Sequence, residues 1–531
     1  MKRHELIVIG AGPAGLSAAI EAARLGMETV VFDENARPGG QLFKQIHKFF
    51  GSREHKAKIR GFRIGEMLLQ EAEAAGVSVR LGATVMGIYP EKQVSVRFSD
   101  HIEQLGGDQI VVSTGAAENM IMFNGWTKPG VIGAGAAQTM MNLHGVQPGR
   151  RILMVGSGNV GLVVGYQLLQ AGCELAAVID AASRVGGYGV HAAKLARQGV
   201  PFLLSHTVLK AEGDESVTGV VIARVDASFR PIPGTEQFME ADAICLAVGL
   251  SPMSQVLRMS GCEILDTPGG LVPKTDEYGR TTISGLYAAG DVAGIEEASS
   301  AMIGGRIAGL AAAHRARYLS DEEFLSRAEE CRASLAQLRQ GMFSKENRAR
   351  ADFTATDEGF PLSDSLLKHG YLAEGELAAF PSAHADAAGW HPVIECTQNI
   401  PCNPCEESCK SGCIRVGRKI TSIPVVDGSK KCTGCGMCVA GCSGQAIFLV
   451  NEGYDETRAA ITMPYEFLPY PQAGQEGTAL DRAGEPVCPA QVVSLRLSPP
   501  ADHTALLTIA VPKEFVGSAR AFRQKEAAVR G

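Results

Sequence analysis

The chain has 531 residues, too many for one hydrophobic core, and this length predicts three or four domains. Its 50 Lys and Arg residues and 57 Asp and Glu residues give a formal net charge of −7, which argues against nucleic-acid binding because that function needs clustered positive charge. Hydrophobic residues at 45% and charged residues at 20% indicate a globular chain rather than a disordered one.

No stretch of the sequence predicts a membrane span or an export signal. The apolar run at residues 6–9 is interrupted at once by Gly10, so it is too short for a signal peptide. The longer uncharged stretch at 152–173 contains Gly156 and Gln167, and it predicts a strand, a turn and a helix. We therefore expect a protein without a membrane span.

The first 33 residues have the pattern of a nucleotide-binding βαβ unit. A strand is expected at 5–9, a helix up to about Leu25 and a second strand at 29–32, which ends in Asp33. The turn between the first strand and the helix contains Gly10, Gly12, Ala14 and Gly15. Glycines at these places allow a tight turn and a close approach of the backbone to a pyrophosphate, and the acid can accept hydrogen bonds from a ribose. The segment predicts a dinucleotide site.

The same pattern returns near residue 156. A strand at 151–155 leads into a turn and a helix, and the next strand ends in Asp180. The turn and helix start contain Gly156, Gly158, Asn159 and Gly161. The acid favours NAD over NADP, although Arg184 keeps NADP open. A vestigial site and a site for another adenine nucleotide also remain open.

Three further motifs indicate which nucleotide the first site takes. Gly39-Gly40-Gln41 follows the second strand, Thr114-Gly115 ends a later strand, and Gly290-Asp291 precedes a small-residue helix. With these motifs, residues 1–317 resemble the two-dinucleotide-binding flavoprotein disulfide reductase superfamily. The resemblance implies FAD in the first site, with Asp291 on the ribityl chain, and a nicotinamide nucleotide in the second. It implies FAD contacts from Gly10, Gly12, Ala14, Gly15, Asp33, Gly40, Gln41, Thr114, Gly115, Gly290 and Asp291.

The distribution of cysteines excludes thiol–disulfide chemistry at the flavin. Cys173 is the first cysteine of the chain, so neither of the places where disulfide reductases carry their redox pair has a thiol. Nine of the 14 cysteines lie between Cys396 and Cys442. Such a patch in a large chain indicates metal binding in a reducing compartment, the cytoplasm.

The second half of this patch has the spacing of bacterial ferredoxins. Cys432, Cys435, Cys438 and Cys442 form the pattern C-x2-C-x2-C-x3-C, in which three thiolates hold one cubane and the fourth binds a second cluster. A zinc site is the alternative, but zinc ribbons use pairs of CxxC knuckles. Aligning the two halves places Cys413 as a spare.

This alignment predicts two [4Fe–4S] clusters with crossed ligands. The first cluster is expected on Cys396, Cys402, Cys405 and Cys442, and the second on Cys409, Cys432, Cys435 and Cys438. One alternative set is Cys402, Cys405, Cys409 and Cys413. A single cluster is another alternative.

The expected fold class is α/β, with two Rossmann-like FAD/NAD domains of the disulfide-reductase type, a ferredoxin-like module with two [4Fe–4S] clusters and a small C-terminal β unit. The expected divisions are an FAD-binding domain in two parts (1–120 and 249–318), an NAD-type domain (121–248), a helical connector and linker (319–392), the 4Fe–4S module (393–452) and the β-rich unit (453–531).

A basic run between Lys44 and Arg63 predicts either a solvated face or a contact with a partner subunit or a phosphate. No triad of serine, histidine and acid and no catalytic lysine is found, so no catalytic side chain is assigned.

The stretch from Val131 to Gly161 and the segment from Gly186 to Lys194 resemble the α (A) subunits of opine oxidases, hydrogen cyanide synthase and dye-linked proline dehydrogenases, and the α chain of heterotetrameric sarcosine oxidase is a further relative. The resemblance implies a hetero-oligomer with an oxidase-like flavoprotein β subunit, and sometimes an FMN between the subunits.

The leading hypothesis is an electron-transferring α subunit of an amino-acid, imino-acid or opine dehydrogenase. In it, electrons from the partner's flavin pass through FAD and the clusters to NAD or an electron carrier. The alternatives are an autonomous NAD(P)H:ferredoxin-type oxidoreductase and a non-catalytic iron–sulfur scaffold.

Overall fold

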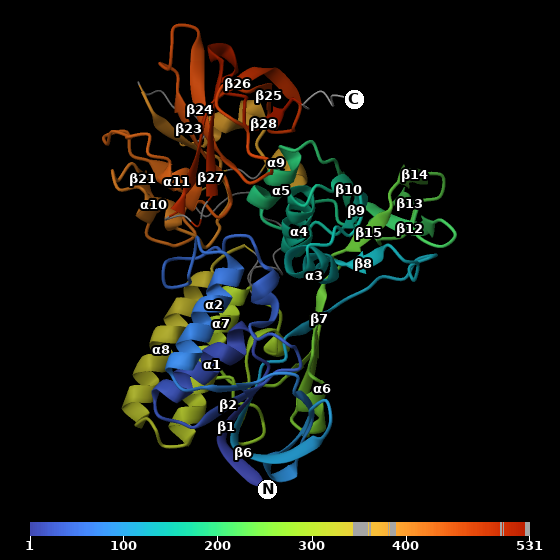
Figure 1. Cartoon of the computed structure of the whole chain (residues 1–531), viewed down its shortest axis with the longest axis vertical. Coiled ribbons are helices and arrows are strands. Elements are labelled where there is room, and N and C mark those ends of the chain that lie inside the picture. Colours follow the sequence, from blue (N-terminus) through green and yellow to red (C-terminus); the bar gives the residue numbers. More distant parts are fainter. Residues whose placement is uncertain are drawn as a thin grey trace. The chain divides into compact units, whose positions relative to one another are not determined.

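The computed structural model of the chain describes residues 1–342, 359–360, 363–380, 382, 389–499, 502 and 504–525. The chain divides into two compact units, each built from several stretches of sequence (Figure 1). Unit 1 comprises Met1–Ile46, Arg60–Asn119 and Gly249–Gln340, and unit 2 comprises His47–Ile59, Met120–Val248 and Gly341–Gly531.

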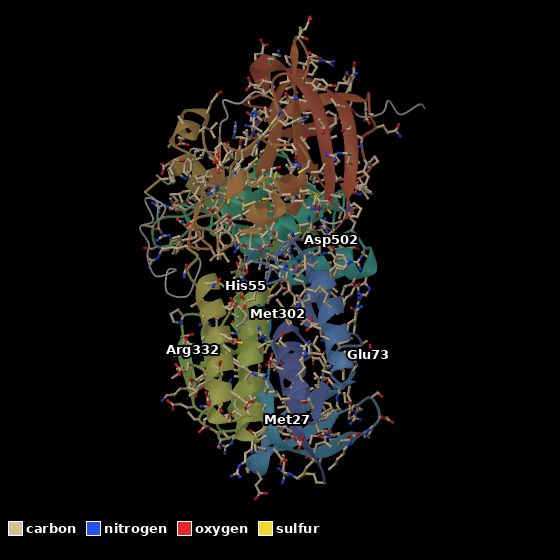
Figure 2. The ribbon with its side chains drawn as sticks, turned by 90° about the vertical axis from the view of Figure 1, so that its left-hand side faces the viewer. Met27, His55, Glu73, Met302, Arg332 and Asp502 are labelled. Atoms are coloured by element: carbon tan, nitrogen blue, oxygen red, sulfur yellow. The ribbon has the colours of Figure 1, made fainter. Side chains whose placement is uncertain are left out.

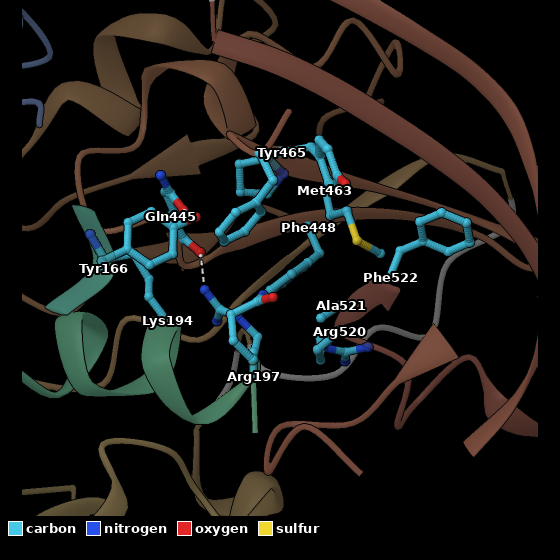
Figure 3. A pocket seen from close by; sticks show the side chains of 13 residues that line it. Tyr166, Lys194, Arg197, Gln445, Phe448, Met463, Tyr465, Arg520, Ala521 and Phe522 are labelled. Carbon is cyan, nitrogen blue, oxygen red and sulfur yellow. Dashed lines mark hydrogen bonds between the residues drawn. The ribbon is translucent and has the colours of Figure 1, made fainter. Parts of the chain in front are cut away.

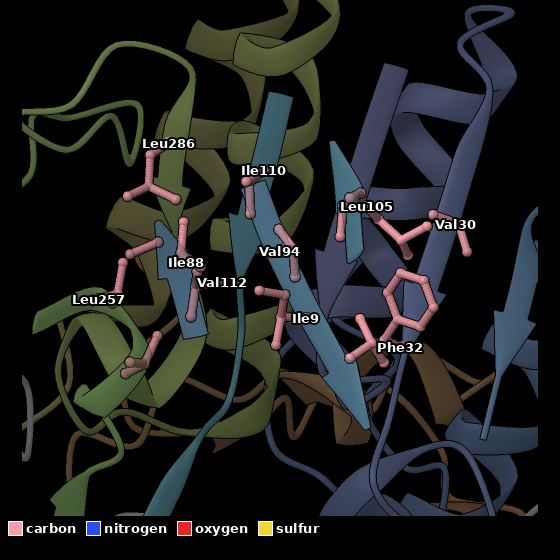
Figure 4. Close-up of a cluster of buried hydrophobic side chains, with 14 of the residues drawn as sticks. Ile9, Val30, Phe32, Ile88, Val94, Leu105, Ile110, Val112, Leu257 and Leu286 are labelled. Carbon is pink, nitrogen blue, oxygen red and sulfur yellow. The ribbon is translucent and has the colours of Figure 1, made fainter. Parts of the chain in front are cut away.

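Unit 1 is built around a seven-stranded sheet with the order β3-β2-β1-β6-β5-β4, to which β19 adds beside β6. The strands β1, β2, β3, β6 and β19 are parallel, whereas β4 and β5 form an antiparallel extension. Their bounds are β1 Lys2–Ile9, β2 Thr29–Phe32, β3 Ser78–Arg80, β4 Thr84–Tyr89, β5 Gln93–Arg97, β6 Ile102–Val112 and β19 Leu286–Ala288. Ile9, Phe32 and Ile110 belong to the apolar core of this sheet (Figure 4). The strands expected at 5–9 and 29–32 are therefore present.

Two helices of unit 1, α1 and α7, pack closely because glycines of α7 leave no side chain at their contact. The helices are α1 Pro13–Arg24, α2 Gly61–Ala74, α6 Gln255–Met259, α7 Ala298–Arg315 and α8 Asp321–Leu338. A Cβ atom at Gly305 of α7 would lie 2.1 Å from the carbonyl oxygen of Ala14 in α1, which no side chain allows. Met302 of α7 is buried, Arg332 of α8 is half-buried and Glu73 of α2 is exposed (Figure 2). The expected connecting helix after residue 319 is α8, which begins at a Ser320–Glu323 capping box.

Unit 2 contains a second parallel sheet with the order β11-β10-β9-β15-β8. The strands are β8 Val131–Gly133, β9 Arg151–Val155, β10 Glu174–Asp180, β11 Phe202–Leu204 and β15 Ala243–Leu246, and the helices are α3 Ala134–His144, α4 Asn159–Gln170 and α5 Gly189–Ala196. Ala134, Leu162 and Leu195 bring the three helices into one core with this sheet. An antiparallel sheet of β12 His206–Glu212, β13 Gly219–Arg224 and β14 Gln237–Glu240 completes this part of the unit.

The remainder of unit 2 is organised by an antiparallel sheet of seven strands with the order β20-β23-β24-β27-β26-β25-β28. Its strands are β20 His391–Ile394, β23 Ile447–Asn451, β24 Arg458–Tyr465, β25 Glu476–Leu480, β26 Pro486–Ser498, β27 Thr504–Pro512 and β28 Ala521–Gln524. The cysteine-rich segment leaves this sheet after β20 and rejoins it at β23, and it carries α10 Pro404–Ser408, α11 Met437–Gly441 and the short pair β21 Ile414–Arg415 and β22 Val425–Val426. The predicted 4Fe–4S module and the predicted C-terminal β unit thus share one sheet.

The short pairs are β7 Ala116–Glu118 with β16 Leu250–Pro252, and β17 Ile264–Thr267 with β18 Gly270–Pro273. Of the predicted linker, α9 Asp364–His369 is described, whereas residues 343–358, 361–362, 381 and 383–388 lie outside the described part. None of the helices in the described residues is long and apolar enough to cross a membrane.

Candidate functional site

The first glycine turn joins β1 to α1, and a carboxylate from the next strand holds it. The backbone N–H of Ala11 donates to Oδ2 of Asp33 over 2.6 Å, and Asp33 is buried at the end of β2. The other oxygen, Oδ1, accepts the backbone N–H of Asn35 over 2.9 Å. Because a carboxylate offers about four lone-pair sites, Asp33 can accept further hydrogen bonds from a ribose.

Each glycine of this turn meets a different physical demand. Gly10 has a φ of +101°, and a Cβ atom at Gly15 would lie 1.9 Å from the Gly10 carbonyl oxygen. At Gly12, by contrast, a Cβ atom would meet nothing within 4 Å. The backbone at Gly12 therefore faces open space at the N-terminus of α1, where unpaired N–H groups favour a phosphate.

Other predicted FAD residues converge on this turn within unit 1. A Cβ atom at Gly40 would lie 2.9 Å from the Cα atom of Gly12, and one at Gly290 would lie 2.8 Å from the Cβ atom of Ala14. Asp291 follows Gly290 directly, and its Oδ1 accepts the N–H of Glu296 over 3.3 Å. The structure thus brings the Gly40 loop and the Gly290 loop to the start of α1.

Of the remaining predicted FAD residues, Thr114 and Gly115 follow β6, and Gln41 lies in a short 3-10 helix, Gly40–Lys44. The hydroxyl of Thr114 donates to the carbonyl oxygen of Met253 over 2.7 Å, and Gly115 has a φ of +73°. Gln41, next to Gly40, is exposed. Ser113 was not selected from the sequence, yet its hydroxyl donates to the Ile9 carbonyl oxygen over 2.9 Å and so ties the end of β6 to that of β1.

The second glycine turn, between β9 and α4, repeats this geometry. The backbone N–H and the hydroxyl of Ser157 each donate to Oδ2 of Asp180 over 2.7 Å. A Cβ atom at Gly161 would lie 2.0 Å from the Gly156 carbonyl oxygen, whereas one at Gly158 would meet nothing within 4 Å. The four predicted residues of the turn and their acid therefore have the same arrangement as the first set.

A pair of adjacent glycines lies against each glycine turn: Gly39-Gly40 at the first and Gly186-Gly187 at the second. The sequence analysis did not assign the second pair to a nucleotide site. In the first turn, the N–H of Gly39 donates to the Ala11 carbonyl oxygen over 2.8 Å. In the second, the N–H of Gly186 donates to the Ser157 hydroxyl over 3.0 Å and that of Tyr188 to Oδ1 of Asn159 over 2.8 Å. An internal repeat could have identified the second pair, because the pattern Asp-x3-Arg-x-Gly-Gly begins at Asp33 and again at Asp180.

Within unit 2, the cysteines lie in two groups. Cys396, after β20, has Cys442 and Cys405 as neighbours, and burial together with those two thiols raises its pKa. Burial and the same thiols also raise the pKa of Cys402. Burial followed by Cys442 raises the pKa of Cys405, on α10, to about 12.

The second group contains Cys409, Cys432, Cys435 and Cys438. Burial raises the pKa of Cys438, on α11, and Cys432, Cys409 and Cys435 add to the shift. The spare Cys413 lies against Cys409, where burial and the neighbouring thiols raise its pKa to about 11. Cys402 and Cys405 thus have Cys442 as a neighbour, whereas Cys413 has Cys409, and the assignment of these cysteines to two clusters stays a prediction.

Each of the two groups offers four cysteine sulfurs, which is the donor set that a cubane uses. Backbone N–H groups donate to the sulfurs, from Cys413 to Cys409 over 3.2 Å, from Gly434 to Cys432 over 3.4 Å and from Ala446 to Cys442 over 3.4 Å. Such bonds stabilise ligand thiolates. Within the described residues, no group of three His, Cys, Asp or Glu side chains has the geometry to hold one metal ion.

Part of the predicted basic run is an internal contact of unit 2. Lys48 is buried, and its Nζ donates to the Ala440 carbonyl oxygen over 2.5 Å and to the hydroxyl of Thr504. The Ser443 hydroxyl donates to the Phe49 carbonyl oxygen over 2.7 Å. Residues 47–59 therefore pack against the segment that carries the cysteines. This contact joins residues about four hundred positions apart, so no local pattern predicts it.

Residues 4–305 match the profile of the family described as pyridine nucleotide-disulphide oxidoreductase. The chain belongs to this family. Membership supports the oxidoreductase class, the binding of FAD and a nucleotide, and the Rossmann-like fold. The crystal structure of thioredoxin reductase from T. acidophilum shares this fold, with a TM-score of 0.50 and 22% identity over 60% of this chain and 99% of that one.

Two curated relatives confirm the resemblance of the chain to subunits of opine oxidases and hydrogen cyanide synthase. The A subunit of opine oxidase from Agrobacterium tumefaciens is 33% identical over 334 residues, which cover 58% of this chain and 65% of the relative. The HcnB subunit of hydrogen cyanide synthase from Pseudomonas aeruginosa is 28% identical over 357 residues, which cover 63% and 76%. The chain thus spans less than two thirds of the length of the opine oxidase relative.

Proposed function

We propose that the chain is the electron-transferring FAD and iron–sulfur subunit of a heteromeric dehydrogenase that oxidises an amino acid, an imino acid or an opine. The observation that carries this proposal is the grouping of eight cysteines into two sets of four, in a chain that also has two nucleotide-binding turns. When bound, FAD accepts electrons in pairs and releases them singly, and each cubane carries one electron.

The residues around the first turn would hold FAD. The open backbone at Gly12 and the N-terminus of α1 would receive the pyrophosphate, and Asp33 would accept hydrogen bonds from the adenosine ribose. Asp291 would bind the ribityl chain, since its loop contacts the first turn of α1 through Gly290. Ser113 supports this site indirectly, because it ties together two strand ends beneath the turn.

The second turn would hold NAD or another adenine nucleotide. Its support is the repetition of the first turn, including the open backbone at Gly158 and the end of β10 at Asp180. The Gly186-Gly187 loop crosses the turn as the Gly39-Gly40 loop crosses the first one.

The cysteine groups would hold the two [4Fe–4S] clusters with crossed ligands. Cys442 stands at the C-terminal end of α11 and serves the first cluster, while Cys409 stands after α10 and serves the second. The two short helices therefore each contribute to both clusters, which keeps the clusters close enough for electron exchange.

The partner is proposed from the relatives, which are named as subunits. An oxidase-like flavoprotein β subunit would oxidise the amine and deliver electrons to this chain, and a soluble electron carrier or NAD would accept them. An FMN between the subunits stays a prediction from the resemblance.

A second candidate function is that of an autonomous NAD(P)H:ferredoxin-type oxidoreductase. The complete second turn with Asp180 favours it, because a nicotinamide nucleotide bound there would supply electrons without any partner. In that case the chain alone would reduce a dye rapidly with NADH.

The two functions are separated by one experiment on the chain purified anaerobically, alone and co-expressed with the product of an adjacent oxidase-like reading frame. We expect the pair to reduce a dye with N-alkyl amino acids or proline, and the chain alone to be slow with NADH. Fast NADH turnover by the chain alone, with no amine activity of the pair, would favour the autonomous enzyme.

A further inference from the structure

Arg197 is a buried cation beside the first cysteine group. It follows α5, is 6% exposed, and its Nη2 donates to the carbonyl oxygen of Gln445 over 3.1 Å (Figure 3). Gln445 lies in the turn that begins at Cys442, and the N–H of the next residue, Ala446, donates to the Cys442 sulfur. The guanidinium is therefore fixed to the loop that carries this thiol, and its carbon lies 5.4 Å from the centre of the Phe448 ring.

Among the described residues, no carboxylate pairs with this guanidinium. The buried acid nearby, Glu395, already pairs with Arg482 over 2.6 Å and with Arg520 over 2.5 Å. The hydrogen bond of Arg197 goes to the neutral Gln445 carbonyl instead. Three buried guanidinium groups, those of Arg197, Arg482 and Arg520, thus lie around the single carboxylate of Glu395, which pairs with only two of them and leaves positive charge in excess at this place.

A buried charge without a counter-charge is costly, so this excess calls for an anion nearby. Burial lowers the pKa of Arg197, and Glu395, Tyr166 and Cys442 act against that shift. Cys442 is the one of these three that belongs to the cysteine group. A cubane held by four thiolates carries net negative charge, and it would occupy the side of Arg197 that faces this thiol.

We propose that Arg197 is the buried counter-charge of the cluster held by Cys396, Cys402, Cys405 and Cys442, and that it raises the reduction potential of this cluster. The inference rests on the proposed function. A fixed positive charge in a poorly solvated interior favours the reduced, more negative state of the cluster. Arg197 would thus act on the reduction potential of the cluster without binding it. It lies directly after α5, in the part of unit 2 that carries the second glycine turn.

The second cysteine group has a different environment. Cys435 is exposed, and the cation in contact with its backbone, Arg496, is also exposed, with Nη2 3.4 Å from the Cys435 carbonyl oxygen. Water screens such a charge strongly. We therefore expect the buried cluster to be reduced first, and the exposed cluster to exchange electrons with a soluble acceptor.

The test is a redox titration followed by electron paramagnetic resonance, on the full chain with both clusters reconstituted anaerobically. Arg197→Gln should lower the potential of one cluster so that its one-electron equilibrium changes by about tenfold or more, which corresponds to 59 mV, and leave the other cluster in place. Arg197→Lys should retain most of the wild-type potential. If the signal whose potential shifts in Arg197→Gln is the one that disappears in Cys442→Ser, the shifted signal belongs to the first cluster.

Two further variants keep the test decisive if Arg197→Gln does not fold. Glu395→Gln removes the buried carboxylate, so it should shift the same cluster to a higher potential, and Arg496→Gln is the matched control that should leave it unchanged. Equal shifts of both clusters, or no shift in Arg197→Gln or Glu395→Gln, would overturn the inference. Purified chain without iron and sulfide would instead refute the proposed function, so the two failures are distinguishable.

Discussion

The backbone N–H of Ala11 donates a hydrogen bond of 2.6 Å to the carboxylate of Asp33. This bond ties the glycine turn to the end of the neighbouring strand, so the acid shapes the turn as well as being the proposed partner of the ribose. Ser157 and Asp180 have the same relationship in the second domain.

Asp33→Asn should therefore lose FAD and also weaken the fold. A hydrogen bond to a charged group contributes about 1.5–3 kcal/mol, and the buried amide keeps only part of it. Flavin content after gel filtration and urea unfolding measure the two effects. Asp180→Asn is the matched control, and it should keep FAD while losing any nucleotide of the second site. Equal flavin loss in both variants would contradict separate sites.

Adjacent glycines of α7 provide a sharp test of the packing on α1. Gly305→Ala should destabilise unit 1 by about 1–3 kcal/mol or more, since its Cβ atom would lie 2.1 Å from the Ala14 carbonyl oxygen. Gly304→Ala meets no atom within 4 Å and should be neutral or stabilise by up to about 1 kcal/mol. Thermal unfolding measures both variants. Similar melting temperatures would refute the close contact.

The predicted assignment places Cys442 on the cluster of the earlier cysteines, whereas an assignment in chain order would place it with Cys435 and Cys438. The two assignments predict different outcomes for one variant. Cys442→Ser should remove the cluster of Cys396, Cys402 and Cys405, and should spare that of its sequence neighbours Cys435 and Cys438. Iron content and the electron paramagnetic resonance spectrum check this. Cys488→Ser, in the buried part of β26, is the control and should keep both clusters. Loss of the second cluster in Cys442→Ser would favour a linear assignment.

An ion pair of unit 1 predicts a defined dependence of stability on pH. Arg80 donates to both oxygens of Glu103 over 2.8 and 2.9 Å, and this pair together with His101 lowers the pKa of Glu103 to about 2. A carboxylate with a lowered pKa stabilises the fold above its ordinary pKa of about 4.3, and the contribution disappears as the pH falls toward 2.

Glu103→Gln should thus be less stable than the wild type at pH 7, by less than about 1 kcal/mol because the pair is partly solvated. The difference should shrink below a pH of about 4.3. Urea unfolding at several pH values measures it, with the exposed Glu73→Gln as control. A difference that grows on acidification would contradict the predicted direction.

The local parts of the site are readable from the sequence because each is a short pattern. Gly10, Gly15 and Asp33 lie within one βαβ unit, and Cys432, Cys435 and Cys438 have the spacing that predicts a cubane. The pairing of Cys442 with Cys396 required an alignment of two half-modules. The structure has these two thiols as neighbours, and their binding of one cluster stays a prediction.

Contacts between distant segments could not be predicted. The bond of Arg197 to Gln445 joins residues 248 positions apart, and that of Lys48 to Ala440 joins residues 392 positions apart. Neither residue belongs to a periodic pattern, and Lys48 resembles any solvated lysine in a basic run. The shared sheet was also missed, since β20 comes before the cysteines and β23 after them.

The central claim is that a flavin and cubane iron occupy the same chain. Its most direct test is a count of FAD, iron and acid-labile sulfide in chain reconstituted under anaerobic conditions. We predict one FAD and about eight iron and eight sulfide atoms per chain. Material with flavin but only zinc, or without acid-labile sulfide, would contradict the account.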